Sequence, residues 1–161
     1  MNMYKSLLIL LVACLMPGCG FHLAGEAEFA SELNNTHLKS AFSSKELLRL
    51  LDKHLRANQI NVVDADSATA LLHILNEETE KVVLTVDNDG KAREFELLLR
   101  ITFDVKRPDN SILLDQQTID LNRDFVFDKS DLLGANEEEQ ELFNEMRNDA
   151  AKLIVYRLQT I

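Results

Sequence analysis

Apolar and polar residues alternate most regularly over residues 94–105. Every second residue is a large apolar one, and five of the six residues between them are polar or charged, Leu98 being the exception. Side chains on a strand point alternately to its two faces, so this period of two predicts a strand with one face in a core and the other toward water or a partner. The apolar positions are Phe95, Leu97, Leu99, Ile101, Phe103 and Val105.

Two other segments repeat their apolar residues at the three- and four-residue steps of a helix. The first covers residues 44–57, and Ser43 followed by Glu46 predicts a capping box at its start. The second follows a break at residues 134–136, opens on the acidic residues 137–139, which suit a helix amino terminus, and continues to the end of the chain. The apolar positions are Leu47, Leu50, Leu51 and Leu55 in the first helix, and Leu142, Phe143, Met146, Ala150, Leu153, Ile154 and Leu158 in the second.

Three weaker segments complete the pattern. Residues 36–42 predict a short strand, and residues 70–86 predict a long one that the polar residues 76–80 interrupt. Residues 111–127 predict a further strand whose alternation changes phase near Asp120, which is consistent with a β-bulge. Turns or loops are predicted where Asp, Asn, Gly, Ser and Pro gather, at residues 64–67, 87–90 and 107–110.

The predicted order of elements is strand, helix, three strands and helix, which is typical of an α+β fold. We expect a two-layer sandwich in which both helices cover one face of a single mixed, four-stranded sheet. A chain of 161 residues allows one domain with a real core, and we assign that domain to residues 36–161.

The first 35 residues have the pattern of an exported, lipid-anchored protein. Lys5 precedes ten consecutive apolar residues, whereas a membrane-spanning helix needs about 20, so residues 1–18 are predicted to be a signal peptide. Gly18 followed by Cys19 resembles a bacterial lipobox, and Cys14 is the alternative lipidation site. Cys19 is therefore predicted to carry the lipid that holds the protein on the membrane, with residues 19–35 as the tether.

Composition and motifs argue against several classes of function. The formal net charge is −10, and removing the signal peptide leaves 16 basic and 27 acidic residues, a charge of −11, whereas nucleic-acid binding needs a basic face. The four histidines, at positions 22, 37, 54 and 73, lack the spacing of a metal site, and the acidic turn at residues 87–90 lacks the later Glu of a calcium loop. No nucleophile, phosphate-loop or zinc motif occurs, so we expect no catalytic residue, cofactor or metal.

The residues that follow the predicted lipidation site resemble the start of a known family. Residues 19–23 read Cys-Gly-Phe-His-Leu, which is similar to the start of mature LPS-assembly lipoproteins, the LptE (RlpB) family. Ala24 departs from the family pattern, which commonly has Arg at this position. The resemblance continues in order with Arg123-Asp124-Phe125, the joint from Leu133 to Glu137, the pair Glu139-Gln140, and Tyr156-Arg157-Leu158.

The resemblance implies an outer-membrane lipoprotein, facing the periplasm or lying inside the lumen of the LptD β-barrel. There it would act as a plug, aid barrel assembly and help to pass lipopolysaccharide (LPS) to the outer leaflet. An acidic plug suits a lumen lined with basic groups. The alternative function is that of another tethered periplasmic lipoprotein, an adaptor or a lipid carrier.

LPS is anionic, so this acidic chain would contact it through local basic residues. In the family, such residues are associated with the hairpin tip and the joint before the last helix. In this sequence the acidic residues 87–89 occupy the tip. The candidates for LPS contact are Lys91, Arg93, Arg100 and Lys129.

Overall fold

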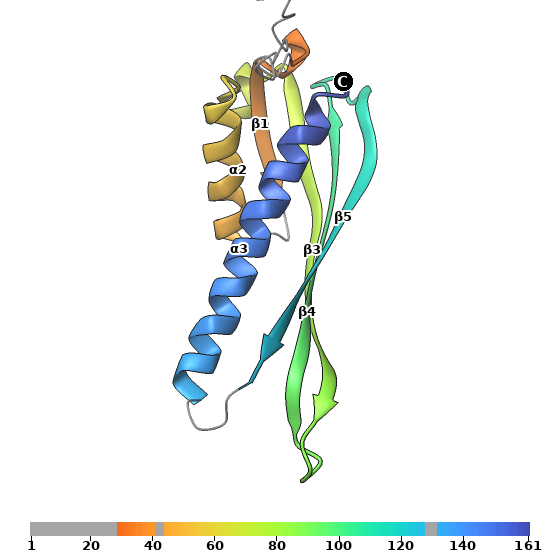
Figure 1. Ribbon diagram of the computed structural model, residues 1–161. Coiled ribbons are helices and arrows are strands. Elements are labelled where there is room, and N and C mark those ends of the chain that lie inside the picture. The colour runs from red at the N-terminus through yellow and green to blue at the C-terminus, as the bar shows by residue number, and fades with distance from the viewer. Residues whose placement is uncertain (1–28, 41–43, 128–131) are drawn as a thin grey trace, which may run out of the picture.

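The computed structural model describes residues 29–40, 44–127 and 132–161, so the predictions for the signal peptide, Cys14, Cys19 and Lys129 lie outside the described residues. The chain forms a sheet and two long helices that cover one of its faces, which confirms the predicted α+β sandwich (Figure 1). In chain order the elements are η1 (Ser31–Leu33), β1 (Asn35–Ser40), α2 (Lys45–Ala57), β2 (Asn61–Val62), η2 (Ala65–Ser67), β3 (Ala70–Val86), β4 (Ala92–Lys106), β5 (Ile112–Val126) and α3 (Leu132–Leu158).

The sheet is mixed, as predicted, but it has five strands where the sequence predicts four. Their order is β2-β1-β3-β4-β5, with β1 parallel to both neighbours and β3, β4 and β5 in an antiparallel meander. The additional strand, β2, consists of Asn61 and Val62, which pair with Asn35 and Thr36. Two residues are too few to show an alternating pattern, so the sequence carries no signal for this strand.

The core lies between the helices and the inner face of the sheet. The alternating residues of β4 form its centre, since all of them from Leu97 to Val105 are buried and Phe95 packs against them. Leu33, in the range predicted to be tether, is also fully buried, whereas Leu153, predicted on the apolar face of the last helix, is 41% exposed. The helices contribute buried side chains from Leu47, Leu50, Leu51 and Leu55 of α2, and from Met146, Ala150, Ala151, Ile154, Val155 and Leu158 of α3.

Helix α2 begins within one residue of its predicted start, but its cap differs from the predicted one. The N-cap residue is Ser44, whose hydroxyl accepts a hydrogen bond from the backbone N–H of Leu47 at 3.1 Å. The predicted cap, Ser43, lies outside the described residues. The Glu46 side chain forms an ion pair with Arg49 one turn later.

Helix α3 begins at Leu132, earlier than the sequence indicates. Gly134 and Asn136, which predict a break, lie inside its first turns. Ala135 between them is buried, so packing offsets the low helix propensity of its two neighbours.

The polar stretch that interrupts the pattern of β3 does not interrupt the strand. Pairing with β4 places Glu77 and Lys81 opposite buried residues of β4, and therefore on the face that the helices cover. Glu77 forms an ion pair there with Arg147 of α3 at 2.7 Å, and the two side chains are only 5% and 17% exposed. Lys81 pairs with Glu139 of α3. These polar residues of β3 attach α3 to the sheet.

The irregularity in β5 lies closer to the start of the strand than predicted. The pairing register between β4 and β5 shifts where residues 114–117 of β5 lie. Asp120, by contrast, pairs regularly with Arg100. The pattern changes near Asp120 because Arg123 occupies a position on the helix-covered face. Its guanidinium donates a hydrogen bond to Asp149 of α3 at 3.0 Å.

Replacing Arg147 with Met would leave the buried carboxylate of Glu77 without its cation, although the backbone N–H of Ser44 still donates to it at 2.6 Å. We expect the free energy of unfolding to fall by about 3–5 kcal/mol, the usual cost of breaking a buried pair from one side. Adding Glu77→Gln should restore part of the loss, since the remaining group is then neutral. Denaturant unfolding followed by circular dichroism measures both effects.

The matched control is Arg49→Met, because the Arg49–Glu46 pair is exposed on α2. Exposed pairs contribute at most about 1 kcal/mol, so the control should lose little stability. Equal losses in the two single variants would contradict the role assigned to Arg147.

Candidate functional site

The two ends of the molecule expose different side chains. Residue 29, where the described chain begins, and the carboxy terminus lie at one end, which we call the proximal end (Figure 1). The β3–β4 hairpin reaches past the first turn of α3 to the opposite end. We define this distal end as residues 80–96, 122–127 and 132–143. At about 3.3 Å per residue, the 15 residues of β4 span about 50 Å.

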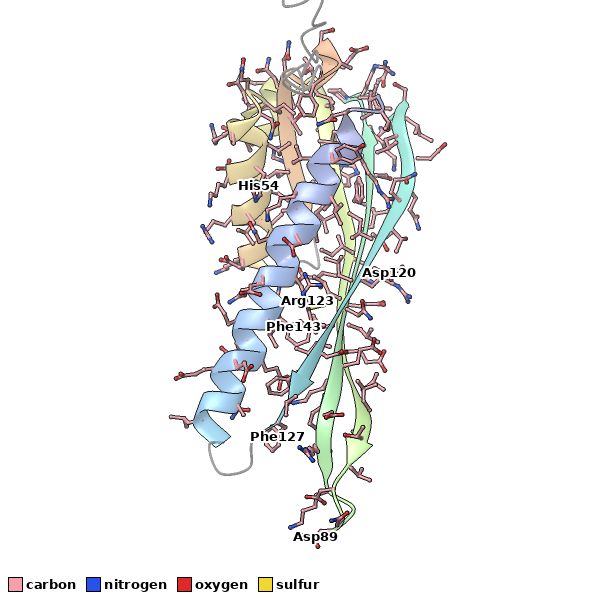
Figure 2. The ribbon with its side chains drawn as sticks, viewed as in Figure 1. His54, Asp89, Asp120, Arg123, Phe127 and Phe143 are labelled. Carbon is pink, nitrogen blue, oxygen red and sulfur yellow. The ribbon has the colours of Figure 1, made fainter. Side chains whose placement is uncertain are left out.

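The hairpin tip is a turn closed by its own side chain. The Asp87 carboxylate accepts hydrogen bonds from the backbone N–H groups of Asp89 at 3.0 Å and Lys91 at 2.9 Å. Gly90 has a φ of 75°, a conformation that glycine adopts without strain. The predicted turn at residues 87–90 is thus confirmed, and Figure 2 shows Asp89 at the extreme of the hairpin.

Large aliphatic side chains are exposed at the distal end. Three belong to β3, one to the last residue of β5 and one to the first turn of α3, which makes five of the nine exposed large hydrophobic residues in the described chain. Clustered apolar exposure on a folded domain commonly marks an interaction surface. We call these five residues the aliphatic patch; they are Val83, Leu84, Val86, Val126 and Leu133, with exposed fractions between 48% and 76%.

An aromatic cluster lies beside this patch, between the sheet and the first half of α3. The rings of Phe95, Phe125 and Phe127 have centroids 6.0–6.4 Å apart. The ammonium of Lys81 lies 4.3 Å from the centroid of Phe95 and 5.0 and 5.6 Å from the other two, an arrangement that cation–π attraction stabilises. Figure 2 shows Phe127 at the end of β5, on the side of the sheet where α3 lies.

The structure brings two of the predicted LPS-contact residues to the distal end. Lys91 directly follows the hairpin turn. Arg93 lies on β4 opposite Phe127, whose backbone N–H donates to the Arg93 carbonyl at 2.8 Å, and opposite residues of an antiparallel pair share a face. Both side chains are exposed. They lie near the aliphatic patch. A search of the sequence for basic residues alone does not find this patch, although the run of apolar residues 82–84 is a weak signal for it.

Arg100 lies apart from this pair. It is seven residues beyond Arg93, about 23 Å along the strand, and it points to the opposite face of the sheet. Its guanidinium donates a hydrogen bond to Asp120 at 2.6 Å. This bond, with the charges of Glu78 and Glu80 nearby, raises the pKa of Arg100 above its ordinary value. Arg100 is therefore already engaged by carboxylates.

A partly buried titratable group, His73, lies further toward the proximal end, on the same open face as Arg100. The His73 imidazole is 3.2 Å from the Asp104 carboxylate, which also pairs with Lys106 at 2.7 Å. Burial lowers the pKa of His73, and the nearby Lys39 and Lys106 act in the same direction, outweighing the opposing effect of Asp104. Among the described residues, Nε2 of His73 has no hydrogen-bond partner.

The other described histidines are dispersed. His37 contacts the carbonyl of Val63 and His54 contacts the side chain of Asn148, both at 2.9 Å. No group of three His, Cys, Asp or Glu side chains within residues 29–40, 44–127 and 132–161 could hold a metal ion. In the same part of the chain, no helix combines the length and the apolar character needed to cross a membrane.

Comparison with known proteins places the chain among its relatives. The family described as LptE, lipopolysaccharide-assembly, matches residues 33–158. The LPS-assembly lipoprotein LptE of Photorhabdus laumondii is 30% identical over 157 residues, which cover 97% of this chain and 85% of that protein. The LPS-assembly lipoprotein LptE of Pectobacterium atrosepticum is 26% identical, with the same two coverages.

Solved structures agree with these relatives. The crystal structure of the rare lipoprotein B from Shewanella oneidensis has a TM-score of 0.69 and 29% identity, covering 79% of this chain and 95% of that one. The solution structure of lipoprotein B from Nitrosomonas europaea also has a TM-score of 0.69, with 26% identity and coverages of 87% and 88%.

The chain is a two-layer α+β sandwich with a projecting hairpin, and the apolar side chains exposed at its distal end are of the kind that commonly marks an interaction surface. The family match, the named relatives and the solved structures all agree on one family. The chain belongs to the LptE family of lipopolysaccharide-assembly lipoproteins. Its function lies in LPS assembly.

The partly buried His73 makes stability depend on pH. The unfolded imidazole takes up a proton near pH 6.5, whereas the partly buried one does so only at lower pH. The stability that neutral His73 contributes is therefore complete above about pH 6.5 and falls as the pH decreases toward the lowered folded-state pKa. Thermal unfolding at pH 7.5 and pH 5.5 should show a larger loss for the wild type than for His73→Gln.

The control for this prediction is His54→Gln, on the surface between the two helices. It should keep the pH dependence of the wild type. If His73→Gln keeps the same dependence as well, the titration of His73 does not control stability in this range.

Proposed function

We propose that this protein is an outer-membrane lipoprotein that binds and plugs an LptD-like β-barrel and assists the insertion of LPS into the outer leaflet. The observation that carries the proposal is the family match over residues 33–158, together with relatives named LPS-assembly lipoproteins. The role requires no catalysis by this chain, because a plug and an assembly partner act through binding.

The proposed lipid anchor would attach the domain to the membrane by its proximal end. Cys19 would carry the lipid, and the ten residues from there to Phe29 reach at most about 35 Å. Phe29 packs against the core at the proximal end, so the domain would be held to the membrane by that end. The hairpin and the aliphatic patch would then point away from the point of attachment.

The distal end offers the two kinds of contact that LPS chemistry calls for. Lys91 and Arg93 can bind phosphate, and the neighbouring aliphatic patch can cover acyl chains. Arg100 would first have to release Asp120, so it is the weaker candidate of the three. Lys129, between the end of β5 and the start of α3, remains a candidate from the sequence.

Affinity purification of the tagged full-length protein from detergent-solubilised outer membrane tests the proposed partnership. We expect a large β-barrel subunit to be recovered in stoichiometric amount, identified by mass spectrometry. If the lipidated protein is purified without a barrel, the proposed plugging function is contradicted and the adaptor function is favoured. If it is purified with an extractable small lipid and no barrel, the carrier function is favoured.

The proposed LPS contact makes a separate prediction. In the complex, Lys91→Gln combined with Arg93→Gln should reduce cross-linking to LPS about tenfold, since two charge-assisted phosphate contacts are lost. Lys45→Gln combined with Lys53→Gln removes the same charge from exposed positions on α2 and should leave cross-linking unchanged. Equal cross-linking by the two double variants would place LPS contact elsewhere.

A further inference from the structure

The face of the sheet turned away from α2 and α3 carries an uncompensated negative charge in its distal half. Strand register shows which side chains share this face, because they alternate with the buried residues of β4. It contains six carboxylates and one guanidinium. We call this surface the acidic face; its charged residues are Glu78, Glu80, Glu94, Glu96, Asp120, Asp124 and Arg100.

On the other face of the same strands, the charges of Glu77, Lys81 and Arg123 are compensated within the molecule. There, Glu77 pairs with Arg147, Lys81 with Glu139, and Arg123 with Asp149. Helix α3 supplies every one of these partners. The acidic face has no layer over it among the described residues, so no other element of the domain can compensate its charge (Figure 1).

Internal contacts on the acidic face do not supply that compensation. Arg100 is shared among three acids, since it bonds Asp120 and lies in the field of Glu78 and Glu80. Glu96 accepts a hydrogen bond from the neutral amide of Asn122 at 2.7 Å, which supplies no positive charge. Figure 2 shows Asp120 on the side of the sheet away from α3.

Two of these acids face each other directly across strands. Glu96 on β4 stands opposite Asp124 on β5. Like charges in directly opposite positions of an antiparallel pair destabilise a sheet. A sequence folded for stability alone would place a cation or a neutral residue at one of the two positions.

The acidic face also has the apolar content of an interface. Leu98 lies half-buried at its centre, between Glu80 and Asn122, and Val126 at its edge is 57% exposed. Beside Leu98 the surface forms a shallow hollow of about 170 Å³, lined among others by Glu80 and Arg100. Apolar side chains enclosed by polar ones are characteristic of protein interfaces.

The negative charge of the acidic face limits which kinds of ligand can bind to it. Phosphate groups of a lipid would be repelled, and so would the same face of a second copy of this chain. The carboxylates do not form a metal site, because no group of three or more in the described chain could hold an ion. A protein surface rich in Arg and Lys provides the missing charge and can also bury Leu98.

We infer that the acidic face is the docking surface for a basic wall of the partner. This inference rests on the proposed function, in which the partner is the β-barrel, and adds the face through which the barrel is held. Lys91 and the members of the aliphatic patch other than Val126 then remain available for a different ligand.

The test compares two triple variants that remove the same charge. Glu80→Gln, Glu96→Gln and Asp124→Asn neutralise the acidic face with side chains of the same shape. Asp64→Asn, Asp66→Asn and Glu138→Gln neutralise three exposed acids elsewhere. Tagged full-length proteins are purified from detergent-solubilised outer membrane, and the barrel retained per molecule is measured at low and high salt.

We expect the acidic-face variant to retain about tenfold less barrel than the wild type at low salt, and the control variant to retain as much as the wild type. High salt should lower retention by the wild type and leave the acidic-face variant nearly unchanged. Thermal unfolding should show the acidic-face variant at least as stable as the wild type, because a like-charge pair has been removed.

The other outcomes are distinct. If both triple variants retain the barrel, or if both lose it to the same extent, the acidic face is not the docking surface. If the wild type itself retains no barrel, the proposed function fails, and the docking inference fails with it. If the wild type retains the barrel and the acidic-face variant does too, only the docking inference is overturned.

Discussion

The position of α3 on the long strands depends on ion pairs between oppositely charged side chains. The helix has 27 residues and is about 40 Å long, and its fully buried large side chains begin only at Met146. Its first half is joined to the sheet by the pair of Lys81 with Glu139, and the pairs of Glu77 with Arg147 and Arg123 with Asp149 follow in its second half. Apolar burial is non-directional, whereas an ion pair fixes which residues meet. The pairs therefore set where the helix lies, and with it how much of the hairpin remains uncovered.

This arrangement divides the charges of the molecule into two groups. Those between the sheet and α3 are satisfied internally, and those on the opposite sheet face are not. At the distal end Lys91 and most of the aliphatic patch lie close to this acidic surface, and Val126 belongs to both. The same end can therefore present two chemistries, one suited to a basic protein and the other to an anionic amphiphile. Under the proposed function, such a division suits a subunit that stays bound to a barrel while LPS passes.

The sequence predicts most of the fold because its apolar periods are long. The alternation of β4 and the leucines of α2 each place several residues on one face, and all of these lie in the core. The errors occur where one residue has a tertiary partner that sequence cannot show. Glu77 and Arg123 look like breaks in a strand pattern because their partners are 70 and 26 residues away. The fifth strand was missed because two residues carry no period.

The candidate site was harder to predict than the fold, for a related reason. Basic residues are visible in a sequence, but whether each one is free depends on register. Arg93 and Arg100 look equivalent in the sequence, yet they lie on opposite faces and only Arg100 faces a carboxylate across the sheet. The aliphatic patch likewise consists of residues that resemble core residues, and only the length of the hairpin beyond α3 leaves them exposed.

The late position of α3 in the chain has a consequence for how the domain folds. The meander of β3, β4 and β5 joins segments that are neighbours in sequence and can form early, whereas β1 pairs with β3 only after α2 has crossed over. Even then the core stays open, because Ile154 and Leu158, near the end of the chain, are fully buried. Until α3 arrives, the apolar face of the meander is uncovered. A chaperone or a binding partner that shields this face would act on a nascent sheet, before the mature surface exists.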